Sequence, residues 1–401
     1  MRKIICAIYF FNLIFCAMTI SNGQTISKNE KFDAEYKKFK IFYESESKKN
    51  GIVGSSFVFL KDNKILASDF YGSQNLEKKQ NVNENTIYHW ASNTKPFTGI
   101  AIMQLRDRNL LKLEDSITKY LPELEKVHNP FGKMSDITIR QLLNHTAGFR
   151  NSTFPYKSGK AWQPFEPTEY AQIEAMLPFT ETLFKPGTKY SYSNLGIVFL
   201  GQIIERLSGD DYEVYVDKNV LKPLEMYRSY FDATPYHLIQ NRSHSYYIEN
   251  GKRTTGRFDA NSGITVSNSG LNSPIPDMIK YLNFLIGDEN KKEIYNGILQ
   301  RSSLEEMFQP TISAALDANG NKGFSTDIGL IFFLDKQNGE VYLGHGGDQN
   351  GFISYIEFNL KKRTASILVF NTNLILPENT PPEKDMVAKL RKAVRKLHDT
   401  F

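Results

Sequence analysis

Ser92 stands three residues before Lys95, at the start of a strongly apolar stretch. The run from Phe97 to Leu105 predicts a buried helix. If Ser92 lies at the start of that helix, Lys95 follows on the same face, one turn along. A serine hydroxyl is a poor nucleophile until its proton is removed, and a lysine in dry surroundings has a pKa low enough to help. The pair therefore predicts nucleophilic catalysis.

The Ser-x-x-Lys pattern is short, and two further copies occur in this chain, Ser45 with Lys48 and Ser116 with Lys119. The first copy lies in a charged segment without an apolar run behind it. The second is followed at once by a proline, which stops a helix. Only Ser92 opens a buried helix. The alternative interpretation is that Ser92 merely caps a core helix.

A second candidate pair is Tyr192 with Asn194, in a loop-like segment. If this loop lies beside Ser92, the Tyr192 phenol can act as general base or proton relay with help from Lys95, and the Asn194 amide can bind a substrate amide. The one other Tyr-x-Asn, at 281–283, falls inside a helical pattern. Taken alone, Tyr192 would be interpreted as an ordinary packed tyrosine.

A third candidate is the glycine-rich segment that begins at His345, with Gly347 and Asp348 behind it. Its glycines allow a substrate backbone to approach closely. His345 is expected to be a donor or proton shuttle near neutral pH. The backbone N–H groups of Asp348 and Ser92 are predicted to form an oxyanion hole. The other histidine considered, His145, is interpreted as structural because it ends a predicted helix.

The elements that must position these residues follow a clear order. Strand patterns near both ends of the chain enclose a stretch, about residues 110–260, in which helical runs dominate. This order predicts an α+β domain whose antiparallel sheet pairs its first strands with its last, with an inserted, mostly helical subdomain. Helices are expected at 32–48, 92–109, 136–149, 197–207, 277–286 and 385–398, and strands at 55–60, 65–71, 329–334, 341–344, 352–358 and 364–370.

The first 23 residues are typical of an export signal. Arg2 and Lys3 precede a mostly apolar stretch, and small residues then predict cleavage before Gln24. The mature domain would be 24–401, in the periplasm or secreted. An uncleaved membrane anchor is the alternative, because the stretch is nearly long enough to span a bilayer. Lipid attachment at Cys16 is less favoured, because bulky Phe15 precedes it.

Composition and charge exclude several classes of protein. A hydrophobic content of 40% with 13% aromatic residues indicates a globular chain. The formal charge is +5, of which the leader supplies two, so the mature chain is near +3. That charge is too mild to predict a nucleic-acid partner. Both cysteines, Cys6 and Cys16, lie in the leader, so the mature chain needs no disulfide.

These three segments together resemble the serine β-lactamase and penicillin-binding-protein superfamily, nearest the class C β-lactamase-like serine hydrolases. Residues 92–95, 192–194 and 345–347 match its three motifs in order, and 51–72, 142–148 and 267–281 match accessory segments, over roughly 54–373. The resemblance implies an antiparallel sheet of five or more strands flanked by terminal helices, with the site between sheet and helical subdomain. It also implies hydrolysis through an acyl-enzyme, with no metal or other cofactor.

One departure concerns the third motif. Class C-like β-lactamases carry Lys-Thr-Gly there and hold the substrate carboxylate with it, whereas this chain has His345 and Gly346. A glycine has no hydroxyl and a neutral imidazole no fixed charge. The His-x-Gly sequence instead resembles the esterase and D-amino-acid peptidase branches of the superfamily. This resemblance implies a small ester, amide or peptide as substrate, with cell-wall peptide among the candidates. A true β-lactamase and a non-catalytic sensor or binding protein remain the alternatives.

Overall fold

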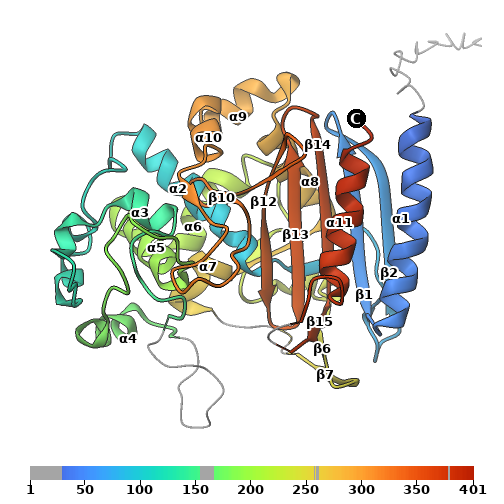
Figure 1. Ribbon diagram of the computed structural model, residues 1–401, viewed down its shortest axis with the longest axis horizontal. Coiled ribbons are helices and arrows are strands. Elements are labelled where there is room, and N and C mark those ends of the chain that lie inside the picture. The colour runs from blue at the N-terminus through green and yellow to red at the C-terminus, as the bar shows by residue number, and fades with distance from the viewer. Residues whose placement is uncertain (1–28, 154–166, 257, 259–261, 378–379) are drawn as a thin grey trace, which may run out of the picture.

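The computed structural model describes residues 29–153, 167–256, 258, 262–377 and 380–401 (Figure 1). The leader predicted for residues 1–23 lies outside this part of the chain. Within the described residues, no helix is both long enough and apolar enough to cross a membrane.

A nine-stranded antiparallel sheet forms the centre of the molecule, in the order β3-β2-β1-β14-β13-β12-β11-β10-β9. β1 pairs with β14, so the sheet joins the first strands of the domain to the last, as predicted. The almost continuous burial of the central strands β1 and β14 fits a sheet covered on both faces. The strands are β1 Gly54–Lys61, β2 Lys64–Asn75, β3 Gln80–Asn81, β9 Ile312–Ser313, β10 Asp327–Ile328, β11 Phe333–Gln337, β12 Glu340–Gln349, β13 Phe352–Asn359 and β14 Thr364–Phe370.

Two helices, α1 (Glu30–Lys49) and α11 (Met386–His398), pack side by side on one face of this sheet (Figure 1). Their apolar sides and the facing strand residues form one buried cluster. The ends of the described chain meet there: the Asn29 side chain donates to the Thr400 carbonyl at 3.5 Å, and the rings of Phe32 and Phe401 lie 5.6 Å apart. Helical periodicity predicted both helices to within a few residues.

The opposite face carries the larger core and the helical region. Its centre is α2 (Lys95–Asp107), whose residues from Lys95 to Leu105 are all buried. The glycine at Gly209, with φ +76°, ends the apolar helix α5 in a left-handed conformation. The remaining helices are α3 Ile139–Leu143, α4 Tyr170–Glu174, α5 Asn194–Ser208, α6 Tyr212–Val216, α7 Val266–Ser269, α8 Ile275–Ile286, α9 Lys292–Ile298 and α10 Arg301–Met307.

Two small sheets lie outside the central one. β4, β8 and β5 form the first, and β15, β6 and β7 the second. The predicted helical stretch therefore also contains the short strands β5, β6 and β7. Their bounds are β4 Ile87–His89, β5 Tyr230–Phe231, β6 Tyr246–Glu249, β7 Lys252–Thr255, β8 Leu271–Pro274 and β15 Thr372–Ile375.

Three expected elements differ from those observed. The strand expected at 329–334 begins only at Phe333, as β11, because the left-handed backbone of Ile331 (φ +73°) interrupts it. The helix expected at 136–149 is only α3, which ends at Leu143, because His145 already has φ +57° and Gly148 φ +84°. A left-handed residue cannot continue a right-handed helix. The strand expected at 341–344 runs on to Gln349 as β12, so the His345 segment is part of the sheet.

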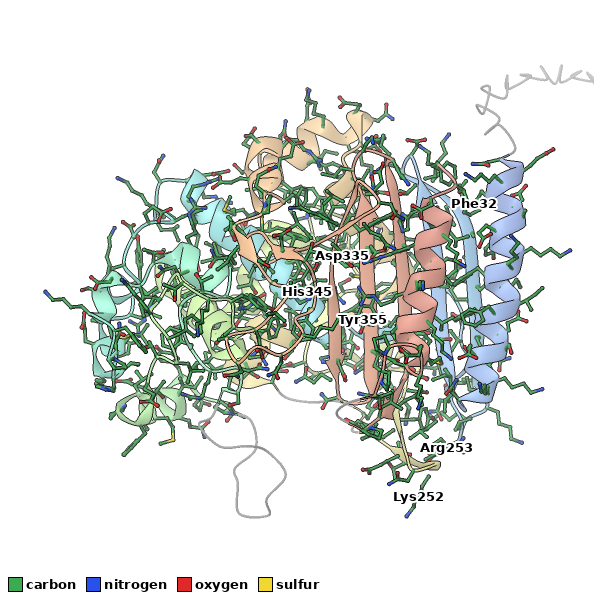
Figure 2. All side chains as sticks on the ribbon, in the orientation of Figure 1. Phe32, Lys252, Arg253, Asp335, His345 and Tyr355 are labelled. Carbon is green, nitrogen blue, oxygen red and sulfur yellow. The ribbon has the colours of Figure 1, made fainter. Side chains whose placement is uncertain are left out.

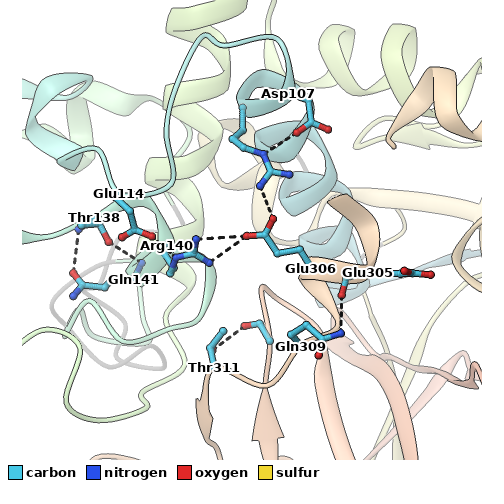
Figure 3. A network of polar contacts seen from close by, with 11 residues as sticks. Asp107, Glu114, Thr138, Arg140, Gln141, Glu305, Glu306, Gln309 and Thr311 are labelled. Atoms are coloured by element: carbon cyan, nitrogen blue, oxygen red, sulfur yellow. Dashed lines mark hydrogen bonds and ion pairs between the residues drawn. The ribbon is translucent and has the colours of Figure 1, made fainter. Parts of the chain in front are cut away.

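A polar network joins the far ends of three helices (Figure 3). Glu306 of α10 forms ion pairs with Arg106 of α2 at 2.5 Å and with Arg140 of α3 at 3.5 Å. All three side chains are a quarter to a third exposed, so each pair contributes at most about 1 kcal/mol. The network fixes orientation more than it adds stability.

Candidate active site

The turn that carries Ser92 is held from several sides. It is a 3-10 turn, η1 (Ala91–Thr94), directly before α2, and Ala91 has φ +49°. Such a conformation costs a non-glycine residue of order 1 kcal/mol and persists only where its surroundings impose it. Here the Thr94 hydroxyl donates to the Ala91 carbonyl at 2.7 Å and accepts from the Leu271 N–H at 3.0 Å. Ser92 is left half-buried at the surface of a cleft.

Lys95 is the first residue of α2 and is fully buried. Its Nζ lies 2.9 Å from Ser92 Oγ and 2.9 Å from the carbonyl oxygen of Asn268. Burial lowers the pKa of the Lys95 amine well below its usual value, and no ion pair with a described carboxylate opposes that shift. In its neutral form the amine donates one N–H to the Asn268 carbonyl. Its lone pair is then available to the Ser92 proton.

Tyr192 completes this corner of the cleft. Its hydroxyl forms a hydrogen bond with the Ser92 side chain, and the Lys95 ammonium position lies 5.0 Å from its ring centroid. Burial raises the pKa of the Tyr192 phenol, and the hydrogen bond with Ser92 offsets only part of that rise. The phenol is therefore protonated at neutral pH, whereas Lys95 is the group able to accept a proton. Of the two roles considered from the sequence, relay fits Tyr192 better than base.

His345 projects from β12 toward the same corner. Its ring lies 6.3 Å from that of Tyr192 and 5.1 Å from that of Phe333. Burial, with the neighbouring Lys95 amine, lowers the pKa of His345 to about 3, so the imidazole is neutral. Nδ1 lies 2.7 Å from the Gly346 carbonyl oxygen and must therefore carry the proton. Because burial disfavours the charged imidazolium, it argues against the predicted proton shuttle near neutral pH.

Gly347 allows the strand to approach the nucleophile turn. A Cβ at this position would lie 2.2 Å from the Trp90 carbonyl oxygen and 2.7 Å from Ser354 Oγ. β11 pairs with β12 only as far as Gly344, so residues 345–349 pair with β13 on one side alone. Their other edge runs past η1, where an extended substrate could add to the sheet.

Asn194 and Asp348 lie at two other points of the cleft lining. The Asn194 side chain donates to Asn151 Oδ1 at 3.0 Å, at the start of α5. Asp348 is on the outer face of the sheet, where it accepts from the Asn373 amide at 2.5 Å. Partial desolvation raises the pKa of the Asp348 carboxyl to about 6. Its side chain thus points away from Ser92, and any contribution to an oxyanion site would come from its backbone.

Two neighbours of the site carried little sequence signal. His145 packs its ring 4.6 Å from that of Tyr192 and accepts the Ser193 N–H at Nδ1, 3.2 Å away. It fits the predicted structural role, but its place is beside the site. The Asn268 carbonyl that holds Lys95 is a backbone group, so residue type could not reveal it. The short α3 and its left-handed His145 are what bring this imidazole to Tyr192.

One cleft of about 350 Å³ runs along this part of the sheet and reaches both of its faces. Its lining includes Ser92, Tyr192 and His345 on the inner side and Tyr355 and Arg391 on the α11 side. Figure 2 shows His345 at the border of the sheet nearest the helical region, with Asp335 and Tyr355 close to it. Among the described residues, no cluster of three or more histidine, cysteine or acidic side chains could hold a metal ion.

This fold is that of the penicillin-binding proteins and serine β-lactamases. The octameric penicillin-binding protein homologue from Pyrococcus abyssi superposes with a TM-score of 0.73 and 25% identity, over 90% of this chain and 77% of that one. A mutant of a class C β-lactamase superposes with a TM-score of 0.72 over 93% of this chain and 99% of that one, at 18% identity. At that identity, the second likeness concerns the fold alone.

The chain belongs to the Beta-lactamase family, whose model matches residues 37–384. Protein flp of Staphylococcus aureus strain COL is 26% identical over 330 residues, which are 82% of this chain. This chain spans only 62% of the length of that relative. The N-acetylmuramyl-L-alanine amidase of Bacillus subtilis is 28% identical over 185 residues, 44% of this chain and 42% of the amidase.

Proposed function

We propose that this protein is an exported serine hydrolase that forms an acyl-enzyme at Ser92 with a small ester, amide or peptide. The observation that carries the proposal is the 2.9 Å contact between Ser92 Oγ and the buried Lys95 amine. A structural cap would need neither the buried amine nor a cleft in front of the hydroxyl. Export depends on the N-terminal leader alone and is part of the proposal.

In the first step, Lys95 accepts the Ser92 proton as Oγ attacks the carbonyl carbon, and the C–O bond to serine forms. The backbone N–H groups of Ser92 and Asp348 stabilise the oxyanion. Tyr192 then donates its proton to the leaving oxygen or nitrogen as the bond between that atom and the carbonyl carbon breaks, and the Lys95 ammonium gives its proton back to Tyr192. Water attacks the ester in the second step and gives its proton back through the same groups, which releases the acid and restores Ser92. His345 and Asn194 contact the substrate.

The substrate class follows from the third motif and from the relatives. A neutral His345 offers no positive charge to a substrate carboxylate. The amidase of Bacillus subtilis and a D-stereospecific amidohydrolase from Streptomyces sp., with a TM-score of 0.64, support amides as substrates. The class C β-lactamase fold keeps a true β-lactamase as the second candidate, with slow or absent turnover of nitrocefin expected. No single observation favours a non-catalytic sensor.

The test is hydrolysis of p-nitrophenyl acetate by the wild type and by Ser92→Ala. Activity should fall to the level of the uncatalysed reaction in Ser92→Ala and persist in Ser45→Ala, a change in the exposed Ser-x-x-Lys copy of α1. A fluorophosphonate probe should label the wild type at Ser92. Turnover that survives in Ser92→Ala, or an unlabelled wild type, would refute the assignment. Mass spectrometry after exposure to esters, β-lactams and D-amino-acid peptides would identify the acyl group.

A further inference from the structure

Three aromatic rings form one wall of the cleft beside Ser92. Phe324, from the segment between β9 and β10, contacts the Tyr192 ring edge-on at 5.5 Å and the Phe333 ring at 5.7 Å. Phe333 begins β11 and lies 6.3 Å from Tyr192. Phe324 and Phe333 line the cleft together with Ser92 and Tyr192. The wall thus combines residues from two distant parts of the chain.

Phe324 is 65% exposed, although the residues whose rings it contacts are both half-buried. An exposed phenyl ring gains stabilisation only when another apolar surface covers it. Aromatic side chains that protrude into a cleft are typical of positions that carry much of the binding energy. The cleft therefore presents an exposed apolar ring beside Ser92.

The position of the wall identifies which part of the substrate reaches it. The proton taken from Ser92 must return to the leaving atom, so that atom lies next to the group that delivers the proton. In the proposed mechanism this group is Tyr192, and Tyr192 is also one ring of the wall. Whatever extends beyond the leaving atom on that side passes Phe333 and Phe324, whereas the acyl group extends from the other side of the carbonyl carbon.

We infer that Phe324 and Phe333 select substrates whose leaving group carries an aromatic or bulky apolar substituent. This inference deepens the proposed function and rests on it. A phenyl ring stacked on the wall is worth roughly tenfold in kcat/KM, the usual scale for an apolar group in a specificity pocket. The selectivity concerns the released alcohol or amine and is independent of the acyl group.

The experiment compares 2-phenylethyl acetate with ethyl acetate, two esters with the same acyl group and leaving alcohols of similar acidity. The wild type should prefer the phenylethyl ester by about tenfold in kcat/KM. In Phe324→Ala the preference should fall to about twofold or less, through loss of the aromatic substrate alone, while Phe324→Tyr keeps it. Phe179→Ala, a change at a 75% exposed phenylalanine outside the cleft lining, should leave the ratio unaltered.

The outcomes separate this inference from the function on which it rests. If the preference for the phenylethyl ester stays the same in Phe324→Ala, the inferred selectivity is wrong, whereas the assignment of Ser92 as nucleophile is unaffected. A wild type that hydrolyses neither ester in a Ser92-dependent way overturns the proposed function and this inference together. An equal loss on both esters in Phe324→Ala indicates a structural role and also counts against selectivity.

Discussion

Two basic side chains near the cleft, the fully buried Lys95 and the half-buried Arg395, behave in opposite ways. Lys95 has a backbone carbonyl and a hydroxyl as partners, and burial lowers its pKa well below the usual value. Burial alone would also lower the pKa of Arg395, but hydrogen bonds and charge from Glu357 and Asp335 raise it instead. Burial acts to lower the pKa of both side chains. Arg395 has carboxylate partners and keeps a permanent positive charge. Lys95 has no carboxylate partner among the described residues and can therefore accept a proton.

The largest effect is expected from removing the neutral amine. Lys95→Met keeps the length of the side chain and should lower kcat/KM for p-nitrophenyl acetate by about a thousandfold, because Ser92 loses its base. The fold should persist, since an apolar side chain suits this dry position. The matched control is Lys119→Met, at the exposed lysine of the Ser116 copy of the pattern, which should leave activity intact. Near-normal activity in Lys95→Met would show that Lys95 is not the base that activates Ser92.

The next largest effect is expected from removing a carboxylate partner of Arg395. Glu357→Gln leaves Arg395 with Asp335 as its one carboxylate partner among the described residues, and should cost about 3 kcal/mol in the free energy of unfolding. Urea denaturation measures this cost. The control is Glu306→Gln at the exposed network of Figure 3, which should cost under about 1 kcal/mol. Equal costs at the two sites would mean that burial does not distinguish them.

A smaller effect is expected at Tyr192. Tyr192→Phe removes the relay and keeps the ring, and should lower kcat/KM by about a hundredfold, with more loss for amides than for activated esters, whose leaving groups need no proton. Tyr190→Phe is the matched control, because its buried hydroxyl has no hydrogen-bond partner among the described residues. Identical losses for amides and activated esters would argue against a relay to the leaving group.

The smallest effect is the pH dependence. Activity needs neutral Lys95, so kcat/KM should rise with pH and level off, with a midpoint well below the usual lysine pKa. The sign follows from a lowered pKa: the active form is lost as pH falls through the pKa of the folded state. His345 stays neutral throughout. Asp348, with a pKa of about 6, is the competing group, and Asp348→Asn should leave the midpoint in place.

Much of this arrangement could be predicted from the sequence, for identifiable reasons. Ser92 was separable from the other Ser-x-x-Lys copies because only it precedes an apolar helical run, and the structure places it before α2. Strand patterns at both ends predicted the pairing of β1 with β14. Periodicity reports which face of an element is buried, and that information is local.

What could not be predicted depends on long-range contacts or on backbone groups. Neutral His345 depends on how completely the site excludes water, and Phe324 reaches Tyr192 only because a loop folds back over β11. The Asn268 carbonyl has no signature in residue type. The sequence predicts that His145 ends a helix. In the structure its backbone is left-handed, and its imidazole ring lies beside that of Tyr192. Local patterns carry no information of this kind.

The contact between Asn29 and Thr400 brings the two ends of the described chain close together. A linker of a few glycine and serine residues between positions 29 and 401 would therefore span the gap without strain. New ends could then be cut in the tight turn after Lys61, at a hairpin tip outside the cleft lining. Such a circular permutant should retain its hydrolytic rate, and would offer attachment points for surface display that leave the cleft unobstructed.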